Sequence, residues 1–173
     1  MKIHLICPVR NVMEEQQKEI DDYARQLQGE GHEVHNPKYA VDQDDATGFN
    51  ICLGHLHSMM MANRIDVFWD VNSKGSHFDL GMAFALNKPI KLVKIYQPDN
   101  EGKSYVKVIQ EIQKQTDRVQ ELLYSLPEKI IDCQEEKLKC IKEQDFKKAA
   151  EYRQQEKELL TQLDIAKKYF KIT

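Results

Sequence analysis

The sequence has no long hydrophobic run, little charge imbalance and few cysteines. No stretch approaches the ~20 apolar residues of a membrane span, and the N-terminal segment IHLIC is too short for the core of a secretory signal. A net charge of −3 over 173 residues provides no general basic surface for nucleic acids or acidic membranes. The four cysteines include no C-x-x-C pair, which argues against a zinc site or a dithiol and for a reducing compartment. We therefore expect a cytoplasmic protein that binds neither membranes nor nucleic acids directly.

Glycine is absent from residues 104–173, and Pro127 is the only proline there. This part is rich in Glu, Lys and Gln, and it follows the turn-forming segment QPDNEGK. The composition predicts three helices, over about 104–124, 128–143 and 146–168. We place the domain boundary after residue 126, on the view that the first of these helices packs back on the preceding domain; the alternative boundary lies near residue 103.

Residues 1–97 alternate between short apolar segments and helical patterns. Strands are expected at KIHLICPV, HEVHNP, IDVFWDV and IKLVKIY, and helices at 13–28, 50–64 and 76–87. Strands that alternate with helices predict a parallel sheet covered on both faces. We therefore expect an α/β fold, a small doubly wound parallel sheet of the Rossmann-like or flavodoxin-like kind, in residues 1–126. A helical hairpin should follow in residues 127–173.

Polar residues follow the first and third of these strands. Ligands of open parallel sheets bind beyond the carboxyl ends of the strands, so these loops are the candidate binding site. Arg10 follows the first strand, and Ser73, Lys74 and Gly75 precede a helix whose free N–H groups favour an anion. Together they predict a phosphate site, although basic loop residues are also often merely solvated. Asp70, at the end of the third strand, is a candidate for a ribose hydroxyl or simply an acid that starts a loop.

Asp79 has two interpretations from the sequence. The stretch Ser76-His77-Phe78-Asp79 fits a capping box with Ser76 as the N-cap, and spacing alone favours this role for Asp79. In the other interpretation, Asp79 acts on a ligand bound in front of the helix. Ser76 and His77 would then also contact the ligand, His77 through a base or phosphate, unless His77 is an exposed first-turn residue.

Two segments resemble the nucleoside 2-deoxyribosyltransferases and their relatives that hydrolyse deoxynucleoside 5′-monophosphates. They are KIHLICPVRN at the start and DVFWDVNSKGSHFDLGMAFALNKPI, and the resemblance covers about residues 1–100. The family has the pattern D-x-x-x-x-G-x-x-x-E-L-G-x-A-x-A-x-x-K-P. This chain matches it with Gly75, Asp79, Leu80, Gly81, Ala83, Ala85, Lys88 and Pro89.

The resemblance implies that Asp79 is the catalytic nucleophile. In the family the corresponding residue is a glutamate, which attacks C1′ of the sugar, expels the base and forms a glycosyl-enzyme. Aspartate withdraws the carboxylate by about 1.5 Å. The family also carries an aspartate on the preceding helix, and the corresponding position here is Ser58, next to His57. Nucleophile and helper are thus both altered.

The C-terminal segment resembles the UVR motif, a helical hairpin found in excision-repair subunits and in some protease adaptors. Its core, Asp145-Phe146, Ala149-Ala150 and Arg153, matches, whereas Gln154 and Glu156 depart from the motif. We expect Asp145 to cap the second helix and Phe146 and Leu159 to pack between the helices. The second helix carries a seven-residue stripe: Ala149, Tyr152, Glu156, Leu159, Leu163, Ala166 and Phe170. The hairpin is expected to bind a protein partner or a second copy.

The function implied is nucleoside or nucleotide binding with N-glycosidic bond cleavage or deoxyribosyl transfer. In this role Asp79 is catalytic, and Arg10, Ser73 and Lys74 bind the sugar-phosphate end. One alternative is a non-catalytic nucleotide sensor whose hairpin docks a protein partner; another is a pure interaction adaptor. No cofactor is implied. We also expect no metal site, because His55 and His57, two residues apart on a helix, face different ways.

Overall fold

The computed structural model describes residues 1–97 and 104–169. The chain forms two compact units, Met1–Lys114 and Gln115–Thr173. The long helix α5, Tyr105–Lys142, begins in the first unit and continues in the second.

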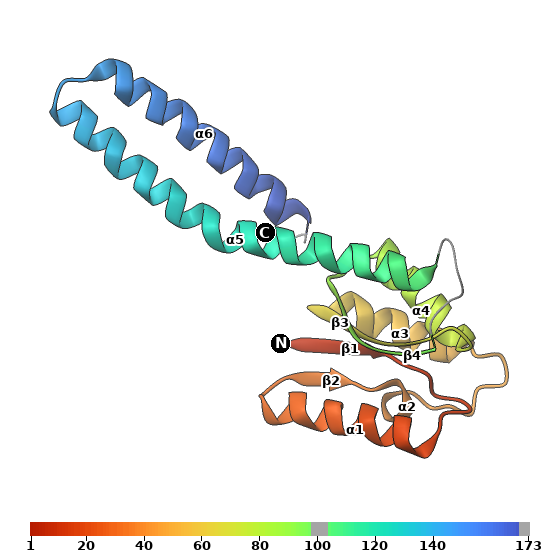
Figure 1. The fold of residues 1–173 in the computed structure, drawn as a ribbon. Coiled ribbons are helices and arrows are strands. Elements are labelled where there is room, and N and C mark those ends of the chain that lie inside the picture. The colour runs from red at the N-terminus through yellow and green to blue at the C-terminus, as the bar shows by residue number, and fades with distance from the viewer. Residues whose placement is uncertain (98–103, 170–173) are drawn as a thin grey trace. The chain divides into compact units, whose positions relative to one another are not determined.

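The first unit is built on the predicted parallel sheet of four strands (Figure 1). Their order is β2-β1-β3-β4. The strands are β1 Lys2–Ile6, β2 Glu33–His35, β3 Arg64–Asp70 and β4 Ile90–Gln97. The chain goes from β1 to β2 on one side and then crosses to β3 on the other side of β1. The carboxyl ends of β1 and β3 therefore flank the switch point, where ligands of open α/β sheets bind.

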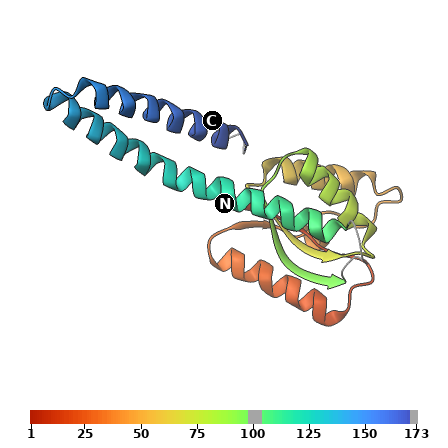
Figure 2. The same ribbon diagram turned by 45° about the horizontal axis from the view of Figure 1, so that its top comes forward.

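Helices cover both faces of this sheet (Figure 1, Figure 2). Helix α1, Glu14–Gly29, lies on one face, and α3, Phe49–Met61, and α4, Lys74–Ala85, lie on the other. A single helical turn, α2, Pro37–Ala40, follows β2. Among residues 1–97 and 104–169, no helix is both long enough and apolar enough to cross a membrane.

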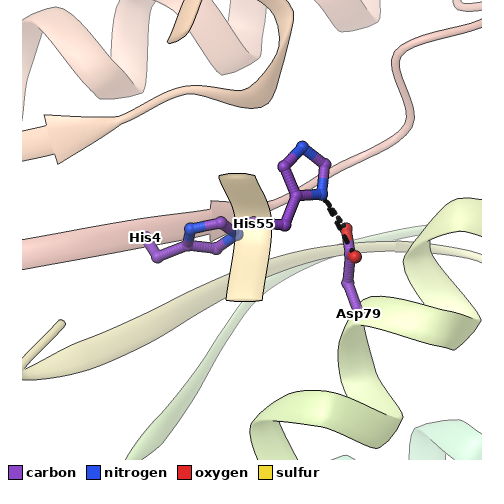
Figure 3. A group of neighbouring side chains, drawn as sticks. All are labelled: His4, His55 and Asp79. Carbon is purple, nitrogen blue, oxygen red and sulfur yellow. Dashed lines mark hydrogen bonds and ion pairs between the residues drawn. The ribbon is translucent and has the colours of Figure 1, made fainter. Parts of the chain in front are cut away.

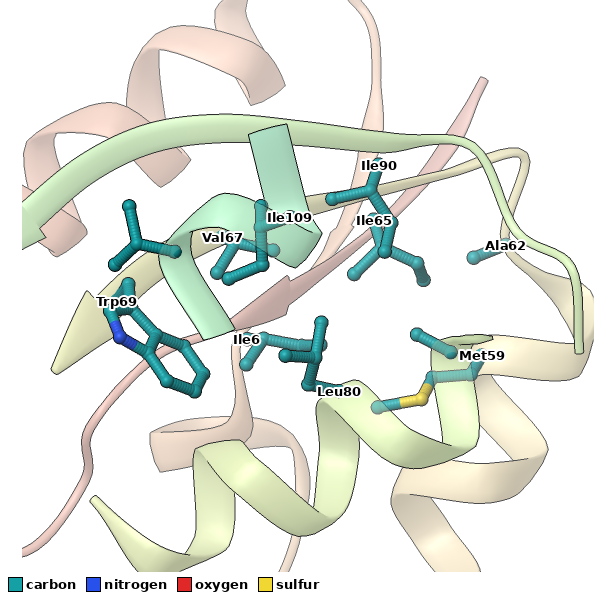
Figure 4. Packing of buried hydrophobic residues seen from close by; sticks show 11 residues of the cluster. Ile6, Met59, Ala62, Ile65, Val67, Trp69, Leu80, Ile90 and Ile109 are labelled. Atoms are coloured by element: carbon teal, nitrogen blue, oxygen red, sulfur yellow. The ribbon is translucent and has the colours of Figure 1, made fainter. Parts of the chain in front are cut away.

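The two faces of the sheet bury separate hydrophobic clusters. On the α1 side, Phe68 packs with Leu5 and Ile20. On the other side, Trp69 and Leu80 form the core together with Ile109, which comes from the start of α5 (Figure 4). Successive strand residues point to opposite faces, so Phe68 and Trp69 enter different clusters. Both residues are buried core residues.

Helix α5 continues through Pro127, where the sequence predicted a break between two helices. Proline costs a helix one backbone hydrogen bond and a steric conflict with the preceding turn. The flanking residues Leu126 and Ile130 are both buried, and burial of two large aliphatic side chains offsets a cost of about 3 kcal/mol. The first two of the three helices predicted after residue 103 are therefore a single helix, α5, in the structure.

The second unit is a hairpin of α5 and α6, Phe146–Tyr169. Asp145 caps α6 by accepting a hydrogen bond from the Lys148 backbone N–H at 3.0 Å, as predicted. The described members of the predicted stripe are all buried or half-buried; Phe170 lies outside the described residues. Ala149 is buried and Leu159 is half-buried, but Phe146 is 68% exposed, so its predicted packing between the helices is wrong.

Glu156 occupies an apolar position of the stripe without leaving its charge unpaired. Its carboxylate accepts hydrogen bonds from Lys137 at 2.5 Å and Gln134 at 2.6 Å, both on α5. The bond from Lys137 has the largest effect on the pKa of Glu156, followed by the bond from Gln134, and both hold this pKa below its usual value. The departure from the UVR pattern thus places an ion pair inside the hairpin.

Candidate functional site

Helix α4 begins three residues earlier than the capping box predicted. Its N-cap is Ser73, whose Oγ accepts from the Ser76 backbone N–H at 3.4 Å and lies 2.8 Å from the Ser76 Oγ. Asp79 therefore lies beyond the first turn and cannot cap the helix. The capping interpretation of Asp79 is therefore wrong. The sequence offered two serines, three residues apart, as possible N-caps, and the interpretation took the second, Ser76, whereas the helix uses Ser73.

Asp79 is instead paired with a histidine from the neighbouring helix. Its two carboxylate oxygens lie 3.0 and 3.2 Å from Nδ1 of His55 on α3 (Figure 3). Asp79 is 5% exposed and His55 7% exposed. A carboxylate only accepts, so Nδ1 of His55 carries the proton and donates it. Such a bond fixes the orientation of the carboxylate.

Two further histidines lie behind this pair. His4, fully buried on β1, stacks on His35 at the end of β2, with ring centroids 4.7 Å apart, and its ring lies 5.6 Å from that of His55. Burial, followed by the neighbouring imidazoles, lowers the pKa of His4 to about 2, and burial lowers that of His35 to about 4. Both rings are therefore neutral near pH 7.

A cavity of about 470 Å³ opens beside Asp79. Other hollows of 300–490 Å³ also lie on the described part of the chain, and Asp79 is not among the residues that line those four. Its walls come from the loops after β1 and β3 and from α3 and α4. Of the predicted site residues, it brings together Arg10, Ser73, Lys74, Gly75, Ser76 and Asp79.

Asp70 and His77 are not among the residues that line this cavity. Asp70 accepts from the Asn72 backbone N–H at 2.8 Å, which is the loop-starting role. The His77 Nδ1 donates to the Ser73 carbonyl at 2.8 Å, and its ring packs 4.7 Å from Trp69 and 5.0 Å from Tyr105. Asp70 thus stabilises the loop after β3, and His77 packs against neighbouring aromatic rings.

Cys7 also lines the cavity, but its thiol is held in the unreactive, protonated form. Burial, followed by the charge of Asp79, raises the pKa of the Cys7 thiol to about 12. A thiol with such a pKa carries almost no thiolate at neutral pH, and the thiolate is the reactive form. Asp79 supplies the carboxylate of this cavity.

The sequence interpretation missed His55 as the partner of Asp79. The helper position was assigned to Ser58, but the Ser58 Oγ lies 3.0 Å from the Nδ1 of His4. His55 lies one helical turn earlier on the same face of α3, where i and i+3 are neighbours. A search of that face for any polar residue, and not only for aspartate, could have found it.

Comparisons with known proteins concern both parts of the chain. Residues 127–162 match the UVR family, described as the UvrB/uvrC motif, which confirms the predicted hairpin motif over that range. No curated protein matches the chain.

Two solved structures are similar to the chain. A CMP N-glycosidase from Clostridium botulinum is 20% identical, with a TM-score of 0.45, over 65% of this chain and 82% of that one. A 2-deoxyribosyltransferase from Bacillus psychrosaccharolyticus is 23% identical, with a TM-score of 0.47, over 58% of this chain and 77% of that one.

Proposed function

We propose that the first unit binds a deoxynucleoside 5′-monophosphate and cleaves its N-glycosidic bond, by hydrolysis or by transfer of the deoxyribosyl group. The observation that carries this proposal is the buried carboxylate of Asp79, which faces a cavity of about 470 Å³ and is oriented by His55. The motif around Asp79 supports the same reaction, because it resembles that of enzymes that use a carboxylate at this position.

The proposed reaction has two steps. A carboxylate oxygen of Asp79 attacks C1′, the C1′–N bond breaks, and the base leaves with the bonding electrons and takes up a proton. Water, or a second base, then attacks C1′ of the glycosyl ester and regenerates the carboxylate. His55 acts as a positioning residue, because its N–H keeps the carboxylate in one orientation.

Other residues that line the cavity suit a phosphate group. Arg10 and Lys74 supply two cations, and the first turn of α4 supplies free N–H groups and the positive end of the helix dipole. Ser73 adds a hydroxyl that is held in place as the N-cap. A 5′-phosphate is therefore the group that distinguishes the preferred ligand from a free nucleoside.

The test is to incubate the purified chain with deoxynucleosides and their 5′-monophosphates and to measure the free base by chromatography. We expect slow release of base from monophosphates, because the aspartate is one methylene shorter than the family's glutamate. Each charge-assisted bond to phosphate contributes about 1.5–3 kcal/mol, so calorimetry should show at least tenfold weaker binding of the free nucleosides. Arg10→Gln should narrow this difference. Equal affinity for both forms would remove the phosphate site from the proposal.

A non-catalytic nucleotide sensor is the second candidate, and the exposed face of the hairpin favours it. Tyr124, Ile131 and Leu138 are spaced by seven residues on α5 and are 86%, 55% and 55% exposed. A repeat of seven places them along one side of the helix, where apolar residues suit another helix. In this case a bound nucleotide is not cleaved, and the hairpin carries the signal to a partner.

We expect a chain that ends at Leu126 to remain folded and to lose the self-association that this face of the hairpin provides. It keeps Val106 and Ile109, which are buried in the core of the first unit. A matched chain that ends at Ser104 should be strongly destabilised, since each lost side chain contributes about 1.5–3 kcal/mol. Light scattering and thermal melts compare both chains with the full-length protein. Insoluble protein from the Leu126 chain would show that the hairpin is needed for folding, and a monomeric full-length chain would assign the apolar face to a different protein.

A further inference from the structure

Three neighbouring histidines, His4, His35 and His55, have buried ring nitrogens next to the hydrophobic clusters of the first unit. Strand β1 otherwise contributes aliphatic side chains to the two clusters, namely Ile3, Leu5 and Ile6, yet its central residue is His4. Within the described residues, the Nε2 atoms of His4, His35 and His55 are all buried and have no hydrogen-bond partner. A buried nitrogen without a partner is costly, and the Nε2 of His4, whose ring lies beside that of His55, is the one that a ligand could take up.

The other ring nitrogen of His4 and of His55 is held by a polar side chain. Ser58 lies 3.0 Å from the Nδ1 of His4, and Asp79 lies 3.0 Å from the Nδ1 of His55. For His4, Ser58 is an outer partner of the kind that fixes the orientation of an imidazole that binds a metal. With its Nδ1 held by Ser58, neutral His4 can present the lone pair of its Nε2.

His4, His55 and Asp79 are also close enough to bind one ion. One ring nitrogen from each histidine and one carboxylate oxygen lie within 4.8 Å of one another. Ligands about 2.1 Å from a tetrahedral ion lie about 3.4 Å apart, so closure needs side-chain movements of only about 1 Å. The three residues come from β1, α3 and α4 and are all at least nine-tenths buried (Figure 3).

We propose that His4, His55 and Asp79 form a binding site for a divalent first-row transition-metal ion, of which Zn²⁺ and Co²⁺ are the probes. Two imidazoles and one carboxylate form a ligand set that suits such ions and not Mg²⁺ or Ca²⁺, which prefer oxygen ligands alone. His55 binds through Nδ1, and its proton moves to Nε2, so no proton has to leave the cluster. The proposal departs from our sequence expectation of no metal, which weighed only His55 with His57.

The ion and the proposed substrate compete for the same carboxylate. An ion bound to Asp79 withdraws the electron pair that would attack C1′, so the metal-loaded chain should not release base. The metal site itself does not depend on the proposed activity, because it is defined by ligand atoms alone. The cavity thus has two states: one without metal, which takes the substrate, and one in which Asp79 is bound to the ion.

The experiment is titration of the chelator-treated full-length chain with Co²⁺, followed by its visible absorption, and with Zn²⁺, followed by calorimetry. We expect one ion per chain and a higher thermal midpoint in its presence. His55→Gln and Asp79→Asn should each weaken binding by about 100-fold or more, and Ser58→Ala by about 10-fold. His57→Gln is the matched control, since His57 is exposed on the same helix, and it should bind as the wild type does.

Absence of binding by the folded wild-type chain, or unchanged affinity in the folded His55→Gln and Asp79→Asn chains, overturns the metal site. Circular dichroism of each variant identifies any loss of binding that is due to unfolding. Ser58→Ala keeps the test informative in that case, because it leaves every ligand in place. Base release by a chain that binds no ion rejects only the metal site, whereas ion binding by a chain that never releases base rejects only the proposed activity.

Discussion

Asp79→Asn is expected to lower base release by roughly 10³-fold or more while leaving the affinity for the nucleotide nearly unchanged. An amide oxygen is a poor nucleophile toward an anomeric carbon, and removal of a nucleophile has effects of at least this size in other enzymes. The amide has nearly the shape of the carboxylate, and the phosphate contacts from Arg10 and Lys74 remain. Single-turnover base release and calorimetry measure the two quantities separately.

The same substitution distinguishes the observed position of Asp79 from a helix cap. As a cap, the aspartate would tolerate replacement by asparagine at a cost of about 0.3–1 kcal/mol. In the buried pair with His55, the substitution exchanges a charge-assisted bond for a neutral one, a difference of about 1–2 kcal/mol. Asp22→Asn, at an exposed position on α1, is the matched control and should change neither turnover nor nucleotide affinity.

Asp79→Glu restores the longer acid of the family and should increase the rate of base release. The added methylene moves the carboxylate into the cavity by about 1.5 Å, and errors of about 1 Å in position cost ~100-fold in rate. Ser58→Asp should give no further gain, because Ser58 is bonded to His4 and not to Asp79. If wild type, Asp79→Glu and the double variant all release no base, the enzyme proposal fails and the sensor remains.

Much of the fold follows from patterns that are local in the sequence. The strand and helix alternation predicted the parallel sheet, and the seven-residue repeat from Ala149 to Ala166 predicted which face of α6 is buried in the hairpin. These patterns work because burial repeats with the period of the element itself. The break predicted at Pro127 failed for the opposite reason, since burial of the neighbouring Leu126 and Ile130 overrides the local cost of proline.

The site was only partly predictable because its chemistry depends on contacts between distant residues. Arg10, Ser73, Lys74 and Gly75 were found because they follow strand ends, a position that the sequence displays directly. His55 lies 24 residues before Asp79 in the chain, and no local spacing relates them. His4 lies in a strand whose pattern reads as core, so only the fold shows which polar side chains surround it.

Free energy of unfolding is expected to fall by about 3 kcal/mol when the pH of the chelator-treated chain is lowered from 7.5 to 5. The folded pKa values of His4 and His35, about 2 and about 4, lie below the ordinary value of 6.5. Between those values and 6.5 the unfolded chain takes up protons that the folded chain excludes, so stability is lost as the pH falls. His4 contributes about 2 kcal/mol of this change, and the half-buried His35 contributes less.

The groups that face the His4 and His35 rings do not reverse the direction of this change in the free energy of unfolding. The His55 ring adds repulsion to a protonated neighbour, whereas the carboxylate of Asp79 opposes the shift of His35 without cancelling it. Carboxylates with ordinary pKa values near 4 remain mostly ionised above pH 5, so the window isolates the histidines. Urea unfolding at several pH values measures the slope of the free energy of unfolding against pH. His35→Gln should make it shallower, whereas His57→Gln, which alters an exposed ring, should leave it unchanged. A stability that stays flat from pH 7.5 to 5 would show that the folded chain accepts protons on these rings, because only equal proton uptake by both states removes the slope.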